Sequence, residues 1–269
     1  MDLNGVQGIE ADLLDHHSLH EAMEGVDTVY SMASPMPGTD ADFMRVNTEG
    51  VSNLLEVARE AKVKSFVHLS TMDVYGSAHQ LITAESEPKP QNDYQRSKLA
   101  ADNLVLESAK QGTSPRVTVL RAAKAVGSRD TSLVVPILKM VEAGSVNLPS
   151  AGMMSFSHPL DIAEAMYRSA TNPRLGKSLY LIKSFDATPE ELAVSIRDSL
   201  GRKSAVKKEG VFSGSRMPPY TREQLKSHLI LSPQPAWSEL GYAPRYDLRT
   251  TCDDIAQWYK KNPWATEQD

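Results

Sequence analysis

The chain has 269 residues, 41% hydrophobic and 23% charged, a composition typical of a globular protein with a full core, either one large domain or a core with a small appendage. Its net charge of −5, without a basic stripe, argues against nucleic acid as a partner, and no apolar run approaches the roughly 20 residues that cross a membrane. The first residues do not resemble a signal peptide, and the single cysteine, Cys252, excludes an intrachain disulfide and a multi-cysteine metal site and favours a cytoplasmic location.

Short apolar runs alternate with longer segments of helical periodicity, a pattern that predicts an α/β fold on a parallel sheet. We expect strands at residues 8–13, 27–32, 63–69 and 116–121. We expect helices at 18–24, 41–61, 94–108 and 132–143, with a turn-rich loop at 75–93. Beyond residue 121 the pattern loosens, and the expected helices at 159–170, 189–200, 222–229 and 250–260 are joined by polar loops.

Tyr94 and Lys98 open the expected helix at 94–108, and their spacing of four places both side chains on one face. A fixed ammonium beside a phenol favours the phenolate, so we expect Lys98 to lower the pKa of Tyr94 from its ordinary value of about 10. Such a pair can exchange a proton with a substrate. Alone, the pattern is weak, because both residue types are common on solvated helix faces.

The expected strand at 63–69 runs into Ser70 and Thr71, whose hydroxyls would lie at the carboxyl edge of a parallel sheet. Ligands of open α/β sheets bind at that edge. A hydroxyl there can hydrogen-bond a substrate oxygen while Tyr94 exchanges its proton. Both residues could also simply end a strand, and it is the combination with Tyr94 and Lys98 that favours a functional role.

The order of several short motifs resembles the extended short-chain dehydrogenases/reductases, which include the NAD-dependent epimerases and dehydratases of sugar nucleotides. The matching segments run almost from end to end of the chain: residues 10–15, 31–34, 47–50, 68–76, 119–121, 156–163 and 240–244. The resemblance implies a Rossmann-like, doubly wound parallel sheet with a small C-terminal substrate-binding region. It places the core at residues 1–121 and interleaves the remaining core strands with the smaller region at 122–269.

The resemblance also assigns roles to residues. Thr71, Tyr94 and Lys98 would be catalytic, with Thr71 orienting the substrate oxygen and Lys98 also holding a ribose hydroxyl. The cofactor would be NAD or NADP, bound by Tyr94 and Lys98 together with Asp12, Leu13, Met32, Ala33, Ser34, Asn47 and Ala122. Ser70, Asp73 and Lys124 would contact a small-molecule substrate. The family further implies a homodimer through the helices at 94–108 and 41–61.

One departure from the family pattern is the lack of a glycine-rich phosphate loop between a strand and a helix anywhere in the chain. Such a loop lets backbone amides approach a pyrophosphate. Gly5 and Gly8 give only a partial match that leads into an expected strand. Relative to the family, the first βαβ unit is therefore missing, and we expect weak dinucleotide binding. The choice between NAD and NADP cannot be made without the segment that follows the family's second strand.

Smaller departures narrow the chemistry. Met72 follows Thr71 where family dehydratases have an acid, which disfavours elimination of water. Residues 122–124 replace a Pro-x-Asn motif, so Lys124 either contacts substrate or is solvated. Arg216 and Arg245 are weak candidates for a nucleotide diphosphate, and His16 and His20 lack a third ligand for a metal, so no metal site is expected.

The leading functional hypothesis is an NAD(P)-dependent epimerase or oxidoreductase that acts on a sugar nucleotide or a related hydroxyl or carbonyl compound. One alternative is a carbonyl reductase for a non-nucleotide substrate, because residues 33–36 also resemble family reductases. The other alternative is a non-catalytic binding or regulatory protein with impaired cofactor binding.

Overall fold

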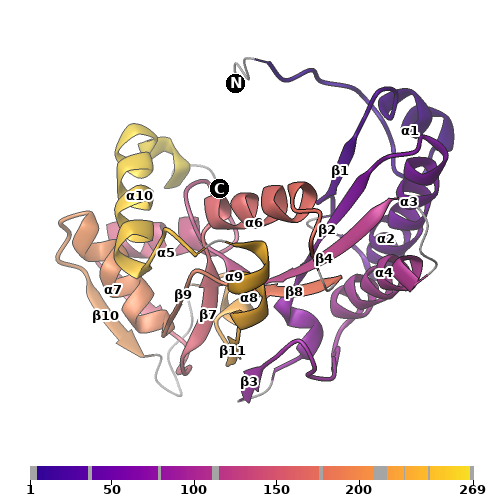
Figure 1. Ribbon diagram of the computed structural model, residues 1–269. Coiled ribbons are helices and arrows are strands. Elements are labelled where there is room, and N and C mark those ends of the chain that lie inside the picture. The colour runs from indigo at the N-terminus through magenta and orange to yellow at the C-terminus, as the bar shows by residue number, and fades with distance from the viewer. Residues whose placement is uncertain are drawn as a thin grey trace.

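The computed structural model describes residues 5–35, 38–77, 80–110, 115–175, 178–208, 217–226, 228–241 and 243–266. Its main sheet has four parallel strands in the order β1 (Thr28–Ser31), β2 (Ser65–Thr71), β4 (Arg116–Ala122) and β8 (Leu179–Ile182) (Figure 1). Because the strands are parallel, their carboxyl ends meet at one edge, where Thr71 lies opposite Ala122. The parallel sheet confirms the predicted α/β fold class.

Helices cover both faces of this sheet. Residues of α1 (His16–Ala22), α3 (Gly50–Glu60) and α4 (Asp93–Lys110) share a core with Phe66 and Val119. Residues of α6 (Pro159–Thr171) and α9 (Gln234–Leu240) share a core with the neighbouring strand residues, Val67 and Leu120. Successive strand residues thus point to opposite faces, and burial on both faces explains why these strands read as continuous apolar runs.

The expected helix at 41–61 is correct in extent but is built from three pieces. Thr39 and Asp42 form a capping box that starts α2 (Asp40–Met44), and a π-helical turn at Arg45–Glu49 then leads directly into α3. Asn47 lies in this π turn and is buried. π turns inside helices are frequent at functional sites, because they re-aim side chains toward a ligand.

The later part of the chain forms a second core beside the main sheet (Figure 1). It contains α5 (Val134–Glu142), α7 (Pro189–Ser199), α8 (Pro219–Gln224), α10 (Leu248–Lys261) and a short 3₁₀ helix, Pro263–Thr266. Three small sheets complete it: β5 (Lys124–Ala125), β7 (Met154–Ser157) and β9 (Phe185–Ala187); β6 (Ser145–Leu148) with β10 (Ala205–Lys208); and β3 (Gln80–Ile82) with β11 (Leu229–Leu231). Cys252 of α10 is fully buried in this core against the backbone of Leu192.

Three expectations were wrong. Residues 8–13 form no strand: this segment pairs with no described strand, is largely exposed, and in Figure 1 runs outside the layers before α1. The expected helix at 222–229 overlaps α8 only as far as Gln224, and Leu229 instead begins β11. The expected loop at 75–93 contains β3, which pairs with β11. These two short strands pair although about 150 residues separate them in the sequence, and no local sequence pattern predicts such a contact.

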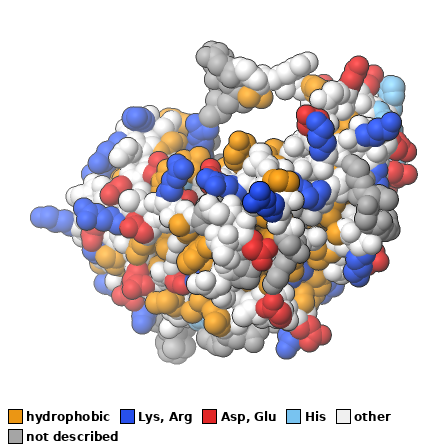
Figure 2. Space-filling model, in the orientation of Figure 1, with side chains coloured by type: hydrophobic (Ala, Val, Ile, Leu, Met, Phe, Trp, Pro, Cys, Tyr) orange, Lys and Arg blue, Asp and Glu red, His pale blue; other side chains and the backbone are white. Residues whose placement is uncertain are grey.

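None of the described helices combines the length and the apolar character needed to span a bilayer. Over the described part of the face in Figure 2, Lys and Arg side chains are interspersed with Asp and Glu.

Candidate active site

Tyr94 and Lys98 lie in the first half of α4, beside the carboxyl ends of β2 and β4. Lys98 is 4% exposed, and its Nζ donates a hydrogen bond of 2.8 Å to the backbone carbonyl of Leu69 on β2. The Ser97 hydroxyl between them donates to the carbonyl of Tyr94 at 2.8 Å and accepts from the Asn47 side chain at 3.0 Å. The π turn is thereby tied to the start of α4, which fixes the orientation of this helix.

The pKa values of this pair differ from the expectation. Burial raises the pKa of the Tyr94 phenol well above its ordinary value, and the charges of Asp73 and Asp102 and the Tyr220 phenol add to the rise. Burial also lowers the pKa of the Lys98 ammonium, against the opposing charge of Asp102. The predicted lowering of the Tyr94 pKa by Lys98 is therefore wrong for this structure, because desolvation of the phenol dominates.

A cavity of about 320 Å³ lies against Tyr94 and is called the Tyr94 cavity below. The ring of Phe43 meets the Tyr94 ring edge to face, with centroids 5.5 Å apart. Two of the predicted substrate residues, Asp73 and Lys124, line the same cavity and form an ion pair at 3.5 Å. Lys124 is also held by the side-chain oxygen of Gln224 on α8. The structure thus brings the predicted proton-exchanging phenol together with two of the three predicted substrate contacts.

The hydroxyl of Thr71 accepts the backbone N–H of Asp73 at 3.1 Å and so caps the 3₁₀ helix Met72–Tyr75. This bond occupies an acceptor site and leaves the hydroxyl hydrogen of Thr71 available for a substrate oxygen. Ser70 is buried at 4% exposure, and neither residue is among those that line the Tyr94 cavity. Thr71 is hydrogen-bonded to Asp73, and Asp73 does line the Tyr94 cavity.

The predicted cofactor residues fall into two groups. Met32, Ala33 and Ser34 follow β1, and Ala122 ends β4, so these four residues lie at the carboxyl edge of the sheet. Asn47 is buried in the π turn. Among the residues that the structure describes, the buried Oγ of Ser34 and Oδ1 of Asn47 have no hydrogen-bond partner, an arrangement that fits a polar ligand along this edge.

Asp12 and Leu13 form the second group, before α1. Asp12 accepts the N–H of Leu14 at 2.9 Å, and the carbonyl of Leu13 accepts the Asn53 side chain at 3.0 Å, so both are fixed against their neighbours. Gly5 and Gly8 have no atom near the place where a side chain would lie. Close packing against the described protein atoms therefore does not require glycine at either position.

A buried ionic network that was not expected from the sequence lies beneath the site. Arg121 Nε contacts Asp102 at 2.8 Å, and its Nη1 contacts the Tyr75 hydroxyl at 2.8 Å, with all three residues at most 3% exposed. Burial raises the pKa of Asp102, opposed mainly by Arg121. Lys98 follows Tyr94 by four residues on α4, and Asp102 follows Lys98 by four. This repeated spacing in the sequence could have indicated that Asp102 lies on the same helix face.

Cavity residues from distant segments were also missed. Tyr220 of α8 faces the Tyr94 cavity, where burial and the charges of Asp73 and Asp130 raise its pKa to about 12. Asp40 of α2 and Glu223 of α8 line the cavity too. No motif identified these residues. The Pro218-Pro219 pair before Tyr220 signals only a helix start.

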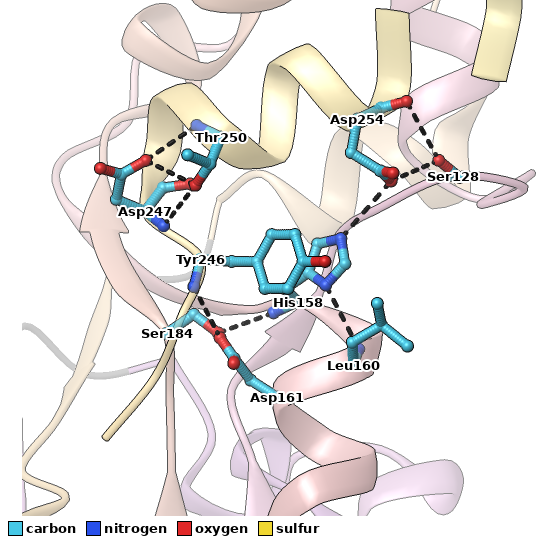
Figure 3. Close-up of polar contacts among 9 residues, drawn as sticks. All are labelled: Ser128, His158, Leu160, Asp161, Ser184, Tyr246, Asp247, Thr250 and Asp254. Atoms are coloured by element: carbon cyan, nitrogen blue, oxygen red, sulfur yellow. Dashed lines mark hydrogen bonds and ion pairs between the residues drawn. The ribbon is translucent and has the colours of Figure 1, made fainter. Parts of the chain in front are cut away.

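Two of the segments that resemble the family, at residues 156–163 and 240–244, come together at the cluster drawn in Figure 3. The carboxylate of Asp161 accepts the Ser184 hydroxyl at 2.5 Å and the backbone N–H groups of Arg245 and Tyr246 at 2.9 and 3.3 Å. Asp161 belongs to the segment at 156–163, and Arg245 directly follows the segment at 240–244. Tyr242 of the second segment lies outside the described residues. Arg245 is not among the residues that line the Tyr94 cavity, and Arg216 lies outside the described residues.

His158 is the second centre of this cluster. Its Nδ1 accepts the N–H of Leu160 and caps α6, its ring stacks on Tyr246 with centroids 3.6 Å apart, and its Nε2 lies 3.5 Å from Asp254 (Figure 3). Ser128 donates to the same carboxylate at 2.5 Å. The residue types match a hydrolase triad, but the carboxylate stands between serine and histidine, so the serine has no base. The cluster joins α10 to α6 and is structural.

Comparison with known proteins identifies the family. The sequence model of the NAD dependent epimerase/dehydratase family matches residues 2–182.

The chain belongs to this family.

Its sequence is 28% identical over 196 residues to a 4-hydroxy-2-methyl-3-oxo-4-farnesyl-3,4-dihydroquinoline-1-oxide ketoreductase of Stigmatella aurantiaca, covering 70% of this chain and 57% of the relative. It is 25% identical over 199 residues to an N-acetyl-alpha-D-glucosaminyl-diphospho-ditrans,octacis-undecaprenol 4-epimerase of Escherichia coli O157:H7, covering 71% and 60%. The chain thus spans less than two thirds of the length of these two relatives.

A solved structure shares the family fold. The enzyme WbmG of Bordetella bronchiseptica, determined in complex with NAD, superposes with a TM-score of 0.80 at 20% identity, covering 97% of this chain and 81% of that one. At this identity the likeness establishes the fold, and it agrees with the Rossmann-like sheet expected from the sequence. Among the described residues, no three His, Cys, Asp or Glu side chains gather as a metal site.

Proposed function

We propose that this protein is an NAD(P)-dependent epimerase or oxidoreductase that exchanges a proton and a hydride with a hydroxyl or carbonyl group of a small molecule. The observation that carries the proposal is the position of Tyr94, a half-buried phenol on the wall of the Tyr94 cavity beside the carboxyl ends of β2 and β4. Family membership and the NAD-bound structural relative support the choice of cofactor.

In this proposal, Tyr94 takes the hydroxyl proton of an alcohol or donates a proton to a carbonyl oxygen. Thr71 donates its free hydroxyl hydrogen to the same oxygen, and Asp73, Lys124 and Ser70 position the rest of the substrate. Lys98 uses one of the three donors of its ammonium group on the Leu69 carbonyl, and the remaining donors would hydrogen-bond a ribose hydroxyl of a bound dinucleotide. A bound dinucleotide supplies the hydride acceptor or donor.

The proposed dinucleotide contacts lie mainly on the carboxyl edge of the sheet, at Met32, Ala33, Ser34, Asn47 and Ala122. Asp12 and Leu13 are the remaining candidates. Calorimetric titration of the full chain with NAD(H) and NADP(H) measures which form binds. It also tests the expectation of weak binding, which micromolar affinity would contradict.

The test of the activity is Tyr94→Phe, which removes the hydroxyl and keeps the ring packed on Phe43. Turnover is expected to fall by at least about a hundredfold, the usual size of general acid–base catalysis, with the fold unchanged by circular dichroism. Tyr167→Phe makes the same change on an exposed tyrosine of α6 that does not line the cavity, and it should leave turnover unchanged. Unchanged turnover in Tyr94→Phe would contradict the proposal.

A ketoreductase of a non-nucleotide substrate is the second candidate, and the similarity to the Stigmatella aurantiaca enzyme favours it. Turnover of a simple ketone without epimerisation of a sugar nucleotide would select this candidate. A binding or regulatory role is the third possibility, and it would persist in the Tyr94→Phe variant. We also propose a cytoplasmic homodimer that associates through α3 and α4.

A further inference from the structure

The charges on the wall of the Tyr94 cavity are mostly negative. Among the described residues that line it, four are carboxylates and two are lysines: Asp40, Asp73, Asp93, Glu223, Lys124 and Lys226. These side chains come from α2, α4, α8 and the turn that follows it, β5 and the 3₁₀ helix after β2. The excess of carboxylate is therefore a property of the assembled cavity rather than of one segment.

Both lysines on this wall are already paired with a carboxylate of the same wall. Lys124 and Asp73, with side chains 8% and 18% exposed, lie 3.5 Å apart. Lys226 Nζ lies 3.0 Å from Glu223 Oε2 on α8. An anion that sought Lys124 would have to displace the carboxylate of Asp73 from a largely buried pair. The exposed Lys226–Glu223 pair is weaker, but an anion at Lys226 would still meet the charge of Glu223.

The remaining carboxylates lie at the junction of α2 and α4. Asp93 is paired with Arg96, one turn further along α4. Asp40 has no ion-pair partner among the described residues, and a hydrogen bond with Asp93 together with its charge raises the pKa of Asp40. The crowding of these two carboxyl groups favours a ligand that brings a hydrogen-bond donor or a positive charge.

The other residues that line the Tyr94 cavity suit an uncharged ligand. The rings of Phe43, Tyr94 and Tyr220 offer apolar surface, and the amides of Gln91 and Gln224 offer polar contacts. The volume of about 320 Å³ lies at the small end of the range for small-molecule sites. A compact ring with hydroxyl, keto or amino substituents matches both the size and the chemistry.

We propose that the Tyr94 cavity selects an uncharged or cationic hydroxy or keto compound over an anionic one such as a nucleotide diphosphate sugar. This inference rests on the proposed function, because it assigns the substrate class of the same site. It favours the non-nucleotide branch of that function. Specificity comes from the excess of carboxylates over lysines on the described wall and from the exposed carboxyl group of Asp40.

The test compares three cyclohexanones that carry a methyl, an ammonium or a carboxylate group at the carbon opposite the ketone, with UDP-glucose as a fourth probe. Dissociation constants are measured by ligand-observed NMR on the full chain, and again on Tyr94→Phe. The ammonium and methyl ketones are expected to bind at least about tenfold more tightly than the carboxylate, since the carboxylates of the wall repel an anionic ligand and attract a cationic one.

Two variants locate the effect. Asp40→Asn should narrow the ratio of ammonium to carboxylate binding by roughly threefold, as expected for one exposed charge. Glu56→Gln makes the same charge change on an exposed residue of α3 that does not line the cavity, and it should leave the ratio unchanged. An unchanged ratio in Asp40→Asn would show that Asp40 does not contribute and would overturn its assigned role.

The proposal is overturned if the carboxylate ketone binds as tightly as the others, if UDP-glucose displaces them, or if none of the ketones binds at millimolar concentration. These outcomes are separate from failure of the proposed function. Binding is measured without turnover, so the selectivity can hold even where Tyr94→Phe leaves catalysis unchanged. Conversely, Tyr94-dependent turnover of UDP-glucose would support the proposed function and reject this substrate class.

Discussion

At the scale of single residues, the protonation state of Tyr94 decides how the site works. Burial and the nearby carboxylates raise its pKa, so the phenol keeps its proton throughout the neutral range in the ligand-free protein. A protonated phenol is ready to donate to a carbonyl oxygen, whereas removal of an alcohol proton first requires the phenol to ionise. In the proposed function, the ligand-free site therefore starts with a phenol that can donate its proton.

This state can be measured directly. Tyrosinate absorbance is recorded against pH for the parent protein and for Tyr94→Phe, and the difference isolates Tyr94. Because the pKa is raised, the difference signal should stay flat to beyond about pH 10, where an ordinary tyrosine is half ionised. A difference signal that appeared near neutral pH would show instead that Lys98 controls the phenol, as the sequence suggested.

The sequence allowed part of this site to be predicted. Tyr94, Asp73 and Lys124 were expected from short motifs, and all three line one cavity. Asp40 and Tyr220 line it as well but were not expected, because no motif marks them and only the tertiary fold brings α2 and α8 together. The pKa of Tyr94 was mispredicted for a related reason. Its spacing from Lys98 is visible in the sequence, whereas its burial is not.

At the scale of elements, His158 holds the start of α6 to α10. Burial lowers its pKa, although Asp254 and Asp161 oppose the change, so the fold favours the neutral ring that accepts the N–H of Leu160. As the pH falls below about 6.5, the unfolded chain takes up a proton that the folded chain resists. The free energy of unfolding should therefore decrease in this range.

The matched variants are His158→Asn and His158→Ala. Asparagine retains a capping acceptor without titrating, so between about pH 7 and pH 5 it should lose less stability than the parent protein. Alanine removes the cap and should cost about 1 kcal/mol relative to asparagine at pH 8. Urea unfolding at each pH measures both effects. Buried His68 is present in the parent protein and in both variants, so it contributes equally to the pH dependence of each. If the unfolding free energies of the parent protein and His158→Asn change in parallel with pH, His158 is not the source of the decrease.

Elements differ in how well the sequence predicted them. Long helices such as α4, α7 and α10 were predicted to within a few residues, because each has an apolar face of helical period and two of them have a capping box. Short strands such as β3 and β11 were missed, since three residues carry no measurable periodicity. The segment at residues 8–13 has the composition of a strand, but no described strand pairs with it.

At the scale of the whole molecule, the proposed dimer requires an apolar face on α3 and α4. Met44 and Leu104 are 45% and 38% exposed and line one shallow groove between these helices and the π turn. Leu104→Glu should raise the dimer dissociation constant by at least about thirtyfold, because a buried leucine contributes roughly 2 kcal/mol. Light scattering after size exclusion measures the change.

Leu160→Glu is the control for this variant, because Leu160 is an equally apolar side chain that is 58% exposed on α6, away from the groove. It should leave the mass unchanged. A parent protein that is monomeric at micromolar concentration, or a dimer that withstands Leu104→Glu, would contradict the proposed interface.

Because Cys252 is buried, the rate at which its thiol is alkylated can report on opening of the C-terminal core. The thiol lies fully covered beneath α10, and burial raises its pKa to about 12, so it has almost no reactive thiolate while the helix is docked. Since no second cysteine competes, each chain can be alkylated once, and only after this region opens. The rate at which the protein gains that single mass label therefore reads out how often the C-terminal core comes apart under native conditions.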